Sequence, residues 1–82
     1  MMYLIVVFRS RKETMDLRSK LESKGINAET INTPRSLCVG CGISLRIDIR
    51  SYTLANLFVT QSHYNSFIGF YRYDSSGKLV NM

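Results

Sequence analysis

The hydrophobic and polar positions along the chain predict four strands. Residues 2–8 form a continuous apolar run rich in branched side chains, which is typical of a central strand covered on both faces. Residues 43–50 alternate strictly between apolar and polar, as in an antiparallel strand with one buried face. Residues 26–33 are weaker and polar enough for an edge strand, and residues 67–73 form an aromatic-rich strand.

A first helix is predicted between the first two strands. Ser10 and Glu13 match a capping box, in which the Ser10 hydroxyl accepts from the Glu13 amide while the Glu13 carboxylate reaches back to the Ser10 amide. The helix should span about residues 11–24, because Gly25 suits the left-handed position after a helix end. Its expected apolar stripe consists of Met15, Leu17 and Leu21.

A second helix is predicted before the last strand. Ser51 is its expected N-cap, and it should end near residues 63–65. Leu54, Leu57, Phe58 and Gln61 recur at the helical spacing i, i+3, i+4 and i+7 and define its expected inward face. The order strand, helix, strand, strand, helix, strand predicts one α+β domain, residues 1–82. We expect the ferredoxin-like βαββαβ sandwich, with a four-stranded antiparallel sheet and both helices on one face. The sequence leaves open a further strand at Leu79 and Val80, after the turn signal of residues 74–77.

The segment from Thr33 to Gly42, between the second and third strands, carries the candidate chemistry. It contains the chain's only proline, both cysteines and two of the five glycines. Proline fixes its own φ and glycine admits positive φ, so the segment is expected to be a shaped loop. The thiols of Cys38 and Cys41 lie three positions apart on that loop.

Charge and composition narrow the class of partner. The formal charge of +5 favours an anionic partner or simply a solvated basic surface. Nucleic-acid binding is disfavoured, because no dense run of lysine and arginine occurs and the aromatics are not interleaved with basic residues. The apolar residues 1–8 are too few to span a membrane and lack the features of a signal peptide. We therefore expect a cytoplasmic protein, in which a Cys-x-x-Cys pair is more often redox-active, metal-binding or catalytic than a structural disulfide.

The predicted topology brings further residues to the end of the sheet that carries the loop. Positive charge and helix N-termini lower the pKa of a thiol, and glycine amides can turn toward an anion. The candidate supporting residues are Arg9, Ser10, Arg11, Lys12, Arg35, Gly40, Gly42 and His63. His63 is more simply a surface residue at a helix end, and Cys38 or Cys41 could be an inert buried thiol.

A metal site is a rival interpretation of the cysteine pair. Structural zinc usually takes four protein ligands, and the chain has two cysteines and one histidine. Zinc or an iron–sulfur cluster would therefore require Cys38 and Cys41 from both copies of a dimer, and we expect no cofactor in a single chain. The doubly apolar first strand also favours a second copy covering the sheet. A thioredoxin motif is disfavoured, because a strand rather than a helix follows the pair.

The chain resembles a family of small bacterial and archaeal proteins described as selenium or sulfur carrier-like. The resemblance rests on Phe8-Arg9-Ser10 at the end of the first strand, Gly25 after the first helix, and a loop that runs from Thr33-Pro34-Arg35 to Cys41-Gly42-Ile43-Ser44-Leu45-Arg46. It covers about the first fifty residues. The chain departs from the family pattern at Cys38, where many relatives are expected to have serine.

The resemblance implies a carrier rather than an enzyme. Cys41 would hold sulfur or selenium as a persulfide or selenosulfide, and Cys38 could resolve that adduct as a disulfide. Protein donors and acceptors of the carried atom are then the expected partners. The alternatives left open are a small dimeric interaction or metal-binding module and a thiol–disulfide redox protein.

Overall fold

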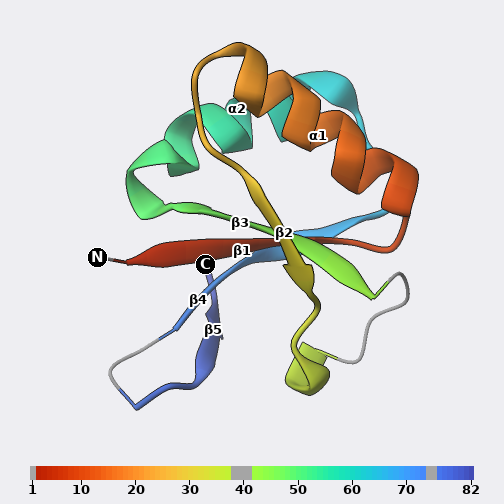
Figure 1. Ribbon diagram of the computed structural model, residues 1–82. Coiled ribbons are helices and arrows are strands. Elements are labelled where there is room, and N and C mark those ends of the chain that lie inside the picture. The colour runs from red at the N-terminus through yellow and green to blue at the C-terminus, as the bar shows by residue number, and fades with distance from the viewer. Residues whose placement is uncertain (1, 38–41, 74–75) are drawn as a thin grey trace.

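The computed structural model describes residues 2–37, 42–73 and 76–82, and of Ser36 only the backbone. Its sheet is antiparallel throughout, in the spatial order β2-β3-β1-β4-β5. The strands are β1 (Tyr3–Phe8), β2 (Glu29–Asn32), β3 (Ile43–Asp48), β4 (Phe67–Tyr73) and β5 (Leu79–Asn81). Both helices, α1 (Arg11–Ser23) and α2 (Tyr52–Ser62), lie on one face of the sheet, as Figure 1 shows. The predicted α+β class is confirmed.

The sheet has five strands rather than the predicted four. β5 pairs with β4, where Tyr73 lies opposite Leu79 and Arg72 opposite Val80. Gly77, with φ of 86°, adopts the left-handed conformation that reverses the chain before β5, while Asp74 and Ser75 of the predicted turn lie outside the described residues. A three-residue strand is too short to show a periodicity in the sequence. β5 is a strand because it pairs with β4.

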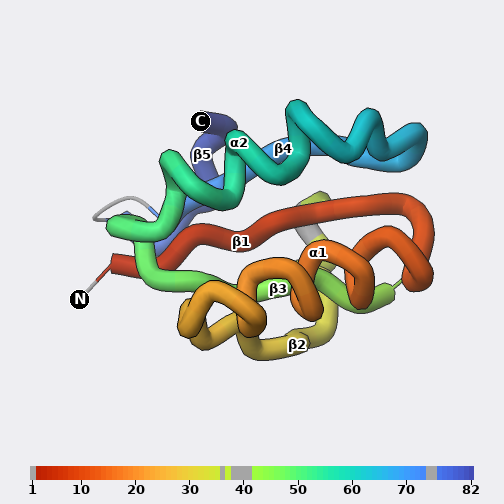
Figure 2. Tube along the Cα trace, turned by 90° about the horizontal axis from the view of Figure 1, so that it is seen from above, coloured from red at the N-terminus to blue at the C-terminus, as the bar shows by residue number. Residues whose placement is uncertain are grey.

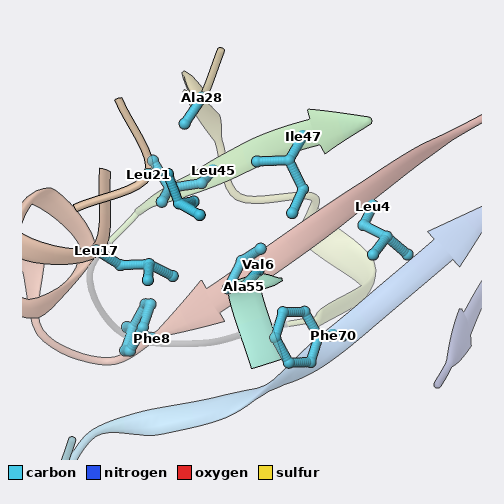
Figure 3. Packing of buried hydrophobic residues seen from close by; sticks show 10 residues of the cluster. All are labelled: Leu4, Val6, Phe8, Leu17, Leu21, Ala28, Leu45, Ile47, Ala55 and Phe70. Atoms are coloured by element: carbon cyan, nitrogen blue, oxygen red, sulfur yellow. The ribbon is translucent and has the colours of Figure 1, made fainter. Parts of the chain in front are cut away.

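β1 is the central strand, as predicted, and is paired with β3 on one side and β4 on the other. Its side chains at Leu4, Val6 and Phe8 join the core beneath the helices, which Figure 3 shows from close by. Ile5 and Val7 point to the opposite face, yet they are only 1% and 0% exposed in the single chain. The second apolar face of β1 therefore does not require a second copy of the protein to cover it.

The helix-free face is covered by the chain's own side chains and loops. Gly69 lies opposite Val7, and the ring of Tyr71 reaches back to within 3.5 Å of the position that a Gly69 Cβ would take. Arg46 lies opposite Ile5 and stacks on the Tyr3 ring at 4.9 Å. On this side Figure 1 also shows the short 3₁₀ helix of residues 35–37 and strand β5.

α1 begins where predicted, but its buried stripe differs. Thr14, Leu17 and Leu21 are buried, whereas Met15 is 37% exposed. Thr14 can be buried because its hydroxyl donates to the Ser10 carbonyl at 2.9 Å. Leu17 and Leu21 follow Thr14 at helical spacing, so these three residues share the inward face of α1. Met15 is the next residue after Thr14 and therefore lies outside that face. Two ion pairs with i,i+4 spacing, Asp16–Lys20 and Arg18–Glu22, form on the outer surface of α1.

The predicted inward face of α2 is confirmed at Phe58 but wrong at Leu57. Ala55 is fully buried, and Tyr52, Phe58 and Val59 pack against the core, whereas Leu57 is 47% exposed. Ala55 belongs to the buried core cluster, so the side of α2 that carries it faces the protein interior. Ser51 occupies the N-cap position without a side-chain cap, and Asp48 instead caps the short 3₁₀ helix η2 (Ile49–Ser51). None of the helices among the described residues has the length and apolar character of a membrane span.

Candidate functional site

The loop that carries the cysteines is closed at its base by two hydrogen bonds. The Thr33 amide donates to the Gly42 carbonyl at 2.9 Å, and the Thr33 and Ser44 hydroxyls are 2.8 Å apart. Ser44 is fully buried, so its hydroxyl has exchanged water for this partner. Gly42 has φ of 78°, a conformation that an L side chain rarely adopts. Cys38, Gly40 and Cys41 lie outside the described residues, and their predicted roles stay predictions.

The chain enters the loop through a short 3₁₀ helix, η1 (Arg35–Leu37). The Leu37 amide donates to the Pro34 carbonyl at 3.0 Å, and the fixed φ of proline favours such a turn. η1 lies on the helix-free side of the sheet in Figure 1. Exposed Arg35 is therefore on the opposite side of the sheet from α1, so the two predicted sources of positive charge do not form one cluster.

The β4–β5 hairpin lies beside the entrance to the loop, which the sequence did not predict. A surface depression of 390 Å³ is lined by Leu37 of η1 and by Gly77, Lys78 and Leu79 of the hairpin. Leu37 immediately precedes Cys38, so this depression borders the cysteine loop. The sequence left β5 open as a further strand but gave no partner for it, so no local signal could have placed these residues together.

Arg9 and the start of α1 lie at the same end of the sheet as the base of the loop. β1 and β3 are antiparallel, with Val6 opposite Leu45. Because the strands run in opposite directions, the end of β1 that leads to Arg9 lies at the end of the sheet where β3 begins, just after Gly42 in the chain. Figures 1 and 2 both show α1 beginning at the end of the sheet where β3 begins. Arg9, Arg11 and Lys12 are all exposed there.

Ser10 and Glu13 form only half of the predicted capping box. The Ser10 hydroxyl accepts from the Glu13 amide at 3.2 Å, as expected. The Glu13 carboxylate does not return to the Ser10 amide, which instead donates to the Ser66 hydroxyl at 3.1 Å. Glu13 accepts hydrogen bonds from the Ser66 hydroxyl and from the amides of Ser66 and Asn65. Ser66 therefore takes the place of the Ser10 amide as a partner of the Glu13 carboxylate. The Ser10 hydroxyl still caps the start of α1.

Hydrogen bonding to this carboxylate lowers the pKa of Glu13 below its ordinary value of 4.5, with the Ser66 hydroxyl as the main cause and the Ser66 and Asn65 amides adding to it. A lowered folded pKa stabilises the fold above the unfolded pKa, and this contribution is lost as pH falls below about 4.5. The turn between α2 and β4 is therefore held to α1 by an ionised carboxylate.

We expect Glu13→Gln to destabilise the protein by about 1 kcal/mol at pH 7, because the charge-assisted hydrogen bonds are weakened. The difference from the native protein should be smaller at pH 3, below the ordinary pKa of 4.5, because the stabilisation by the ionised carboxylate is lost as pH falls. Urea denaturation at both pH values measures this. Glu22→Gln is the matched control, because Glu22 is exposed on the same helix and pairs only with Arg18. An equal loss for Glu13→Gln at both pH values would contradict the assignment.

His63 ends α2 at the same end of the sheet. It has φ of 52°, the left-handed conformation of a helix C-cap, and its side chain is exposed. The next residue, Tyr64, anchors the turn, because its hydroxyl donates to Asp16 at 2.6 Å and its ring packs edge-on against Phe8. Burial, followed by the Asp16 hydrogen bond, raises the pKa of Tyr64, so the hydroxyl keeps its proton at neutral pH.

Comparison with known proteins identifies one family. Residues 3–63, most of the chain and including the whole cysteine loop, match the family described as "Putative Se/S carrier protein-like". No curated protein and no solved structure matches the chain. Within the described ranges, which omit both cysteines, no group of three or more histidine and acidic side chains could hold a metal ion.

Proposed function

The chain belongs to the Se/S carrier protein-like family, and from this premise we propose that it carries sulfur or selenium covalently on Cys41. The observation that supports the proposal most directly is the closed base of the loop. Thr33 is hydrogen-bonded to both Gly42 and Ser44, so the residues that flank the cysteine segment are held together at the end of the sheet. A carrier thiol has to reach into the active sites of other proteins, which such a loop would allow.

Loading takes place as a sulfur transfer that needs no external oxidant. The Cys41 thiolate attacks the outer sulfur of a donor persulfide, the sulfur–sulfur bond of the donor breaks, and the donor leaves as a thiolate. Transfer to an acceptor is the same step with Cys41 as the donor. The acceptor thiolate attacks the outer sulfur of the Cys41 persulfide, and Cys41 leaves as a thiolate. Arg9 and the start of α1 lie at the same end of the sheet as the loop base, and their positive charge would favour the thiolate of Cys41.

Cys38 gives the carrier a second outcome. Its thiolate would attack the inner sulfur of the Cys41 persulfide, forming a Cys38–Cys41 disulfide and releasing hydrosulfide. A cellular thiol would then have to reduce the disulfide before another round. Protein donors and acceptors in the cytoplasm are the partners that this function requires.

We also infer a ferredoxin-like core, because β2-β3-β1-β4 carries both helices on one face, with β5 added at the edge.

The test is to incubate the anaerobically purified protein with a cysteine desulfurase and cysteine, and to analyse its peptides by mass spectrometry. We expect the added mass of one sulfur atom on the peptide that contains Cys41. No adduct, while a known sulfur carrier loads in parallel, would reject the function. Bound zinc or iron in a dimer would instead favour the metal-binding alternative. A reversible Cys38–Cys41 disulfide without any sulfur adduct would favour the redox alternative.

A further inference from the structure

The acidic side chains of the described residues are all engaged within the protein. Glu13 is held by Asn65 and Ser66, and the others form ion pairs with nearby cations. These pairs are Asp16–Lys20, Glu22–Arg18, Glu29–Arg46 and Asp48–Arg50. Each of these carboxylates therefore offsets the charge of a nearby cation. The excess positive charge of the chain belongs to cations outside these pairs.

Part of that excess is concentrated at the end of the sheet that carries the loop. Arg9, Arg11 and Lys12, which we call the basic cluster, are exposed. Within the described part of the chain none of them forms an ion pair with a carboxylate. The basic cluster lies at the end of the sheet where β3 begins. β3 follows Gly42, the residue after Cys41, in the chain. A partner that reaches the cysteine loop from this end therefore meets the basic cluster.

The position of the basic cluster is unfavourable for the stability of α1. Arg11 and Lys12 are the first two residues of the helix, where the helix dipole and the free amides already create positive potential. Acidic residues are the stabilising choice in a first turn, and the one acid there, Glu13, bonds to Asn65 and Ser66. The two cations thus add to the positive helix end, which makes this end of the protein a strong electrostatic target.

We propose that the basic cluster docks the acidic surface of the protein that exchanges sulfur with Cys41, and this inference rests on the proposed function. Clustered charges of one sign accelerate the encounter with a surface of opposite charge. The observations favour a protein over a nucleic acid. The cluster is compact, and the exposed tyrosines that could stack on bases, Tyr3 and Tyr73, lie at the far ends of β1 and β4.

The test uses two synthetic peptides of equal length, each with one cysteine persulfide, flanked by glutamates in one and by glutamines in the other. The second-order rate of sulfur transfer to the protein is measured by mass spectrometry. We expect the acidic peptide to react about tenfold faster at low salt. This preference should nearly vanish at about 1 M salt, where the Debye length is about 3 Å.

Two variants with the same net charge separate the basic cluster from general charge. Arg9→Gln, Arg11→Gln, Lys12→Gln removes the cluster, and Lys24→Gln, Arg50→Gln, Arg72→Gln removes three cations from the other end of the sheet. Each lowers the formal charge of +5 by three. The first variant should lose the preference for the acidic peptide, and the second should keep most of it. The first should also melt no lower than the native protein, because cations at a helix N-terminus are removed.

The outcomes distinguish this inference from the proposed function. Equal rates for both peptides with the native protein, or an unchanged preference after removal of the basic cluster, would overturn the docking surface while leaving the carrier function intact. Loading of neither peptide would reject the function itself. If the rates are equal and the first variant alone loses affinity for a labelled single-stranded oligonucleotide, the basic cluster binds nucleic acid, and the protein docking surface is wrong.

Discussion

Replacing Cys41 with serine is expected to abolish sulfur loading completely, whereas replacing Cys38 with serine leaves the loading rate unchanged. Serine at position 41 keeps the size of the side chain but removes the thiolate that attacks the donor persulfide. Serine at position 38 removes only the thiolate that would resolve the adduct. The Cys41 adduct should therefore persist longer in the Cys38→Ser variant than in the native protein, which releases hydrosulfide. Time-resolved mass spectrometry of the loaded proteins follows both steps.

The matched pair also tests the alternatives for the Cys-x-x-Cys motif. A redox protein or a shared metal site needs both cysteines. In either case the two substitutions would reduce disulfide formation or metal binding equally. Loading that survives in Cys41→Ser and disappears in Cys38→Ser would reverse the assignment of the carrier thiol. Circular dichroism of both variants confirms that each is folded before its chemistry is compared.

Phe8→Ala should destabilise the fold strongly, with a loss of about 3–5 kcal/mol in the free energy of unfolding. Phe8 is fully buried at the end of β1, and its ring packs edge-on against Tyr64 at 5.1 Å and Phe67 at 5.4 Å. The cavity left by alanine would disconnect the core from the turn that holds Glu13. We expect the melting temperature to fall by about 12 °C or more, as measured by thermal circular dichroism.

Two further variants calibrate this effect. Phe8→Leu retains most of the apolar volume and should cost less than half as much as alanine. Leu57→Ala, at a position that is 47% exposed on α2, should change stability by no more than about 1 kcal/mol. A Phe8→Ala protein as stable as Leu57→Ala would show that the aromatic cluster around Phe8 contributes little to the fold.

The candidate site could be predicted from the sequence only in its local parts. Pro34, the glycines and the two cysteines marked the loop, because these residue types restrict the backbone or carry the chemistry wherever they occur. The resemblance at the loop agrees with the family match over residues 3–63. The contact between Leu37 and the β4–β5 hairpin could not be predicted, since it joins segments that are far apart in the sequence.

The engagement of Glu13 illustrates the same limit. The spacing of Ser10 and Glu13 predicted a capping box, and the Ser10 half of it formed. The carboxylate had an alternative that the sequence does not reveal, because Ser66 reaches α1 only when β4 pairs with β1. The folded chain therefore uses Glu13 as a tether between two segments.

The sequence by itself determined the order of the strands and helices from β1 to β4, the position of the loop and the start of α1. These features depend on periodicity, capping and restricted backbone angles, which act over a few neighbouring residues. Only the tertiary structure decided which faces of α1 and α2 are buried, that β5 completes the sheet, and that the basic cluster lies at the end of the sheet where β3 begins. Each of these features depends on packing or strand pairing between segments that are far apart in the sequence. The register of paired strands is set only when the sheet forms.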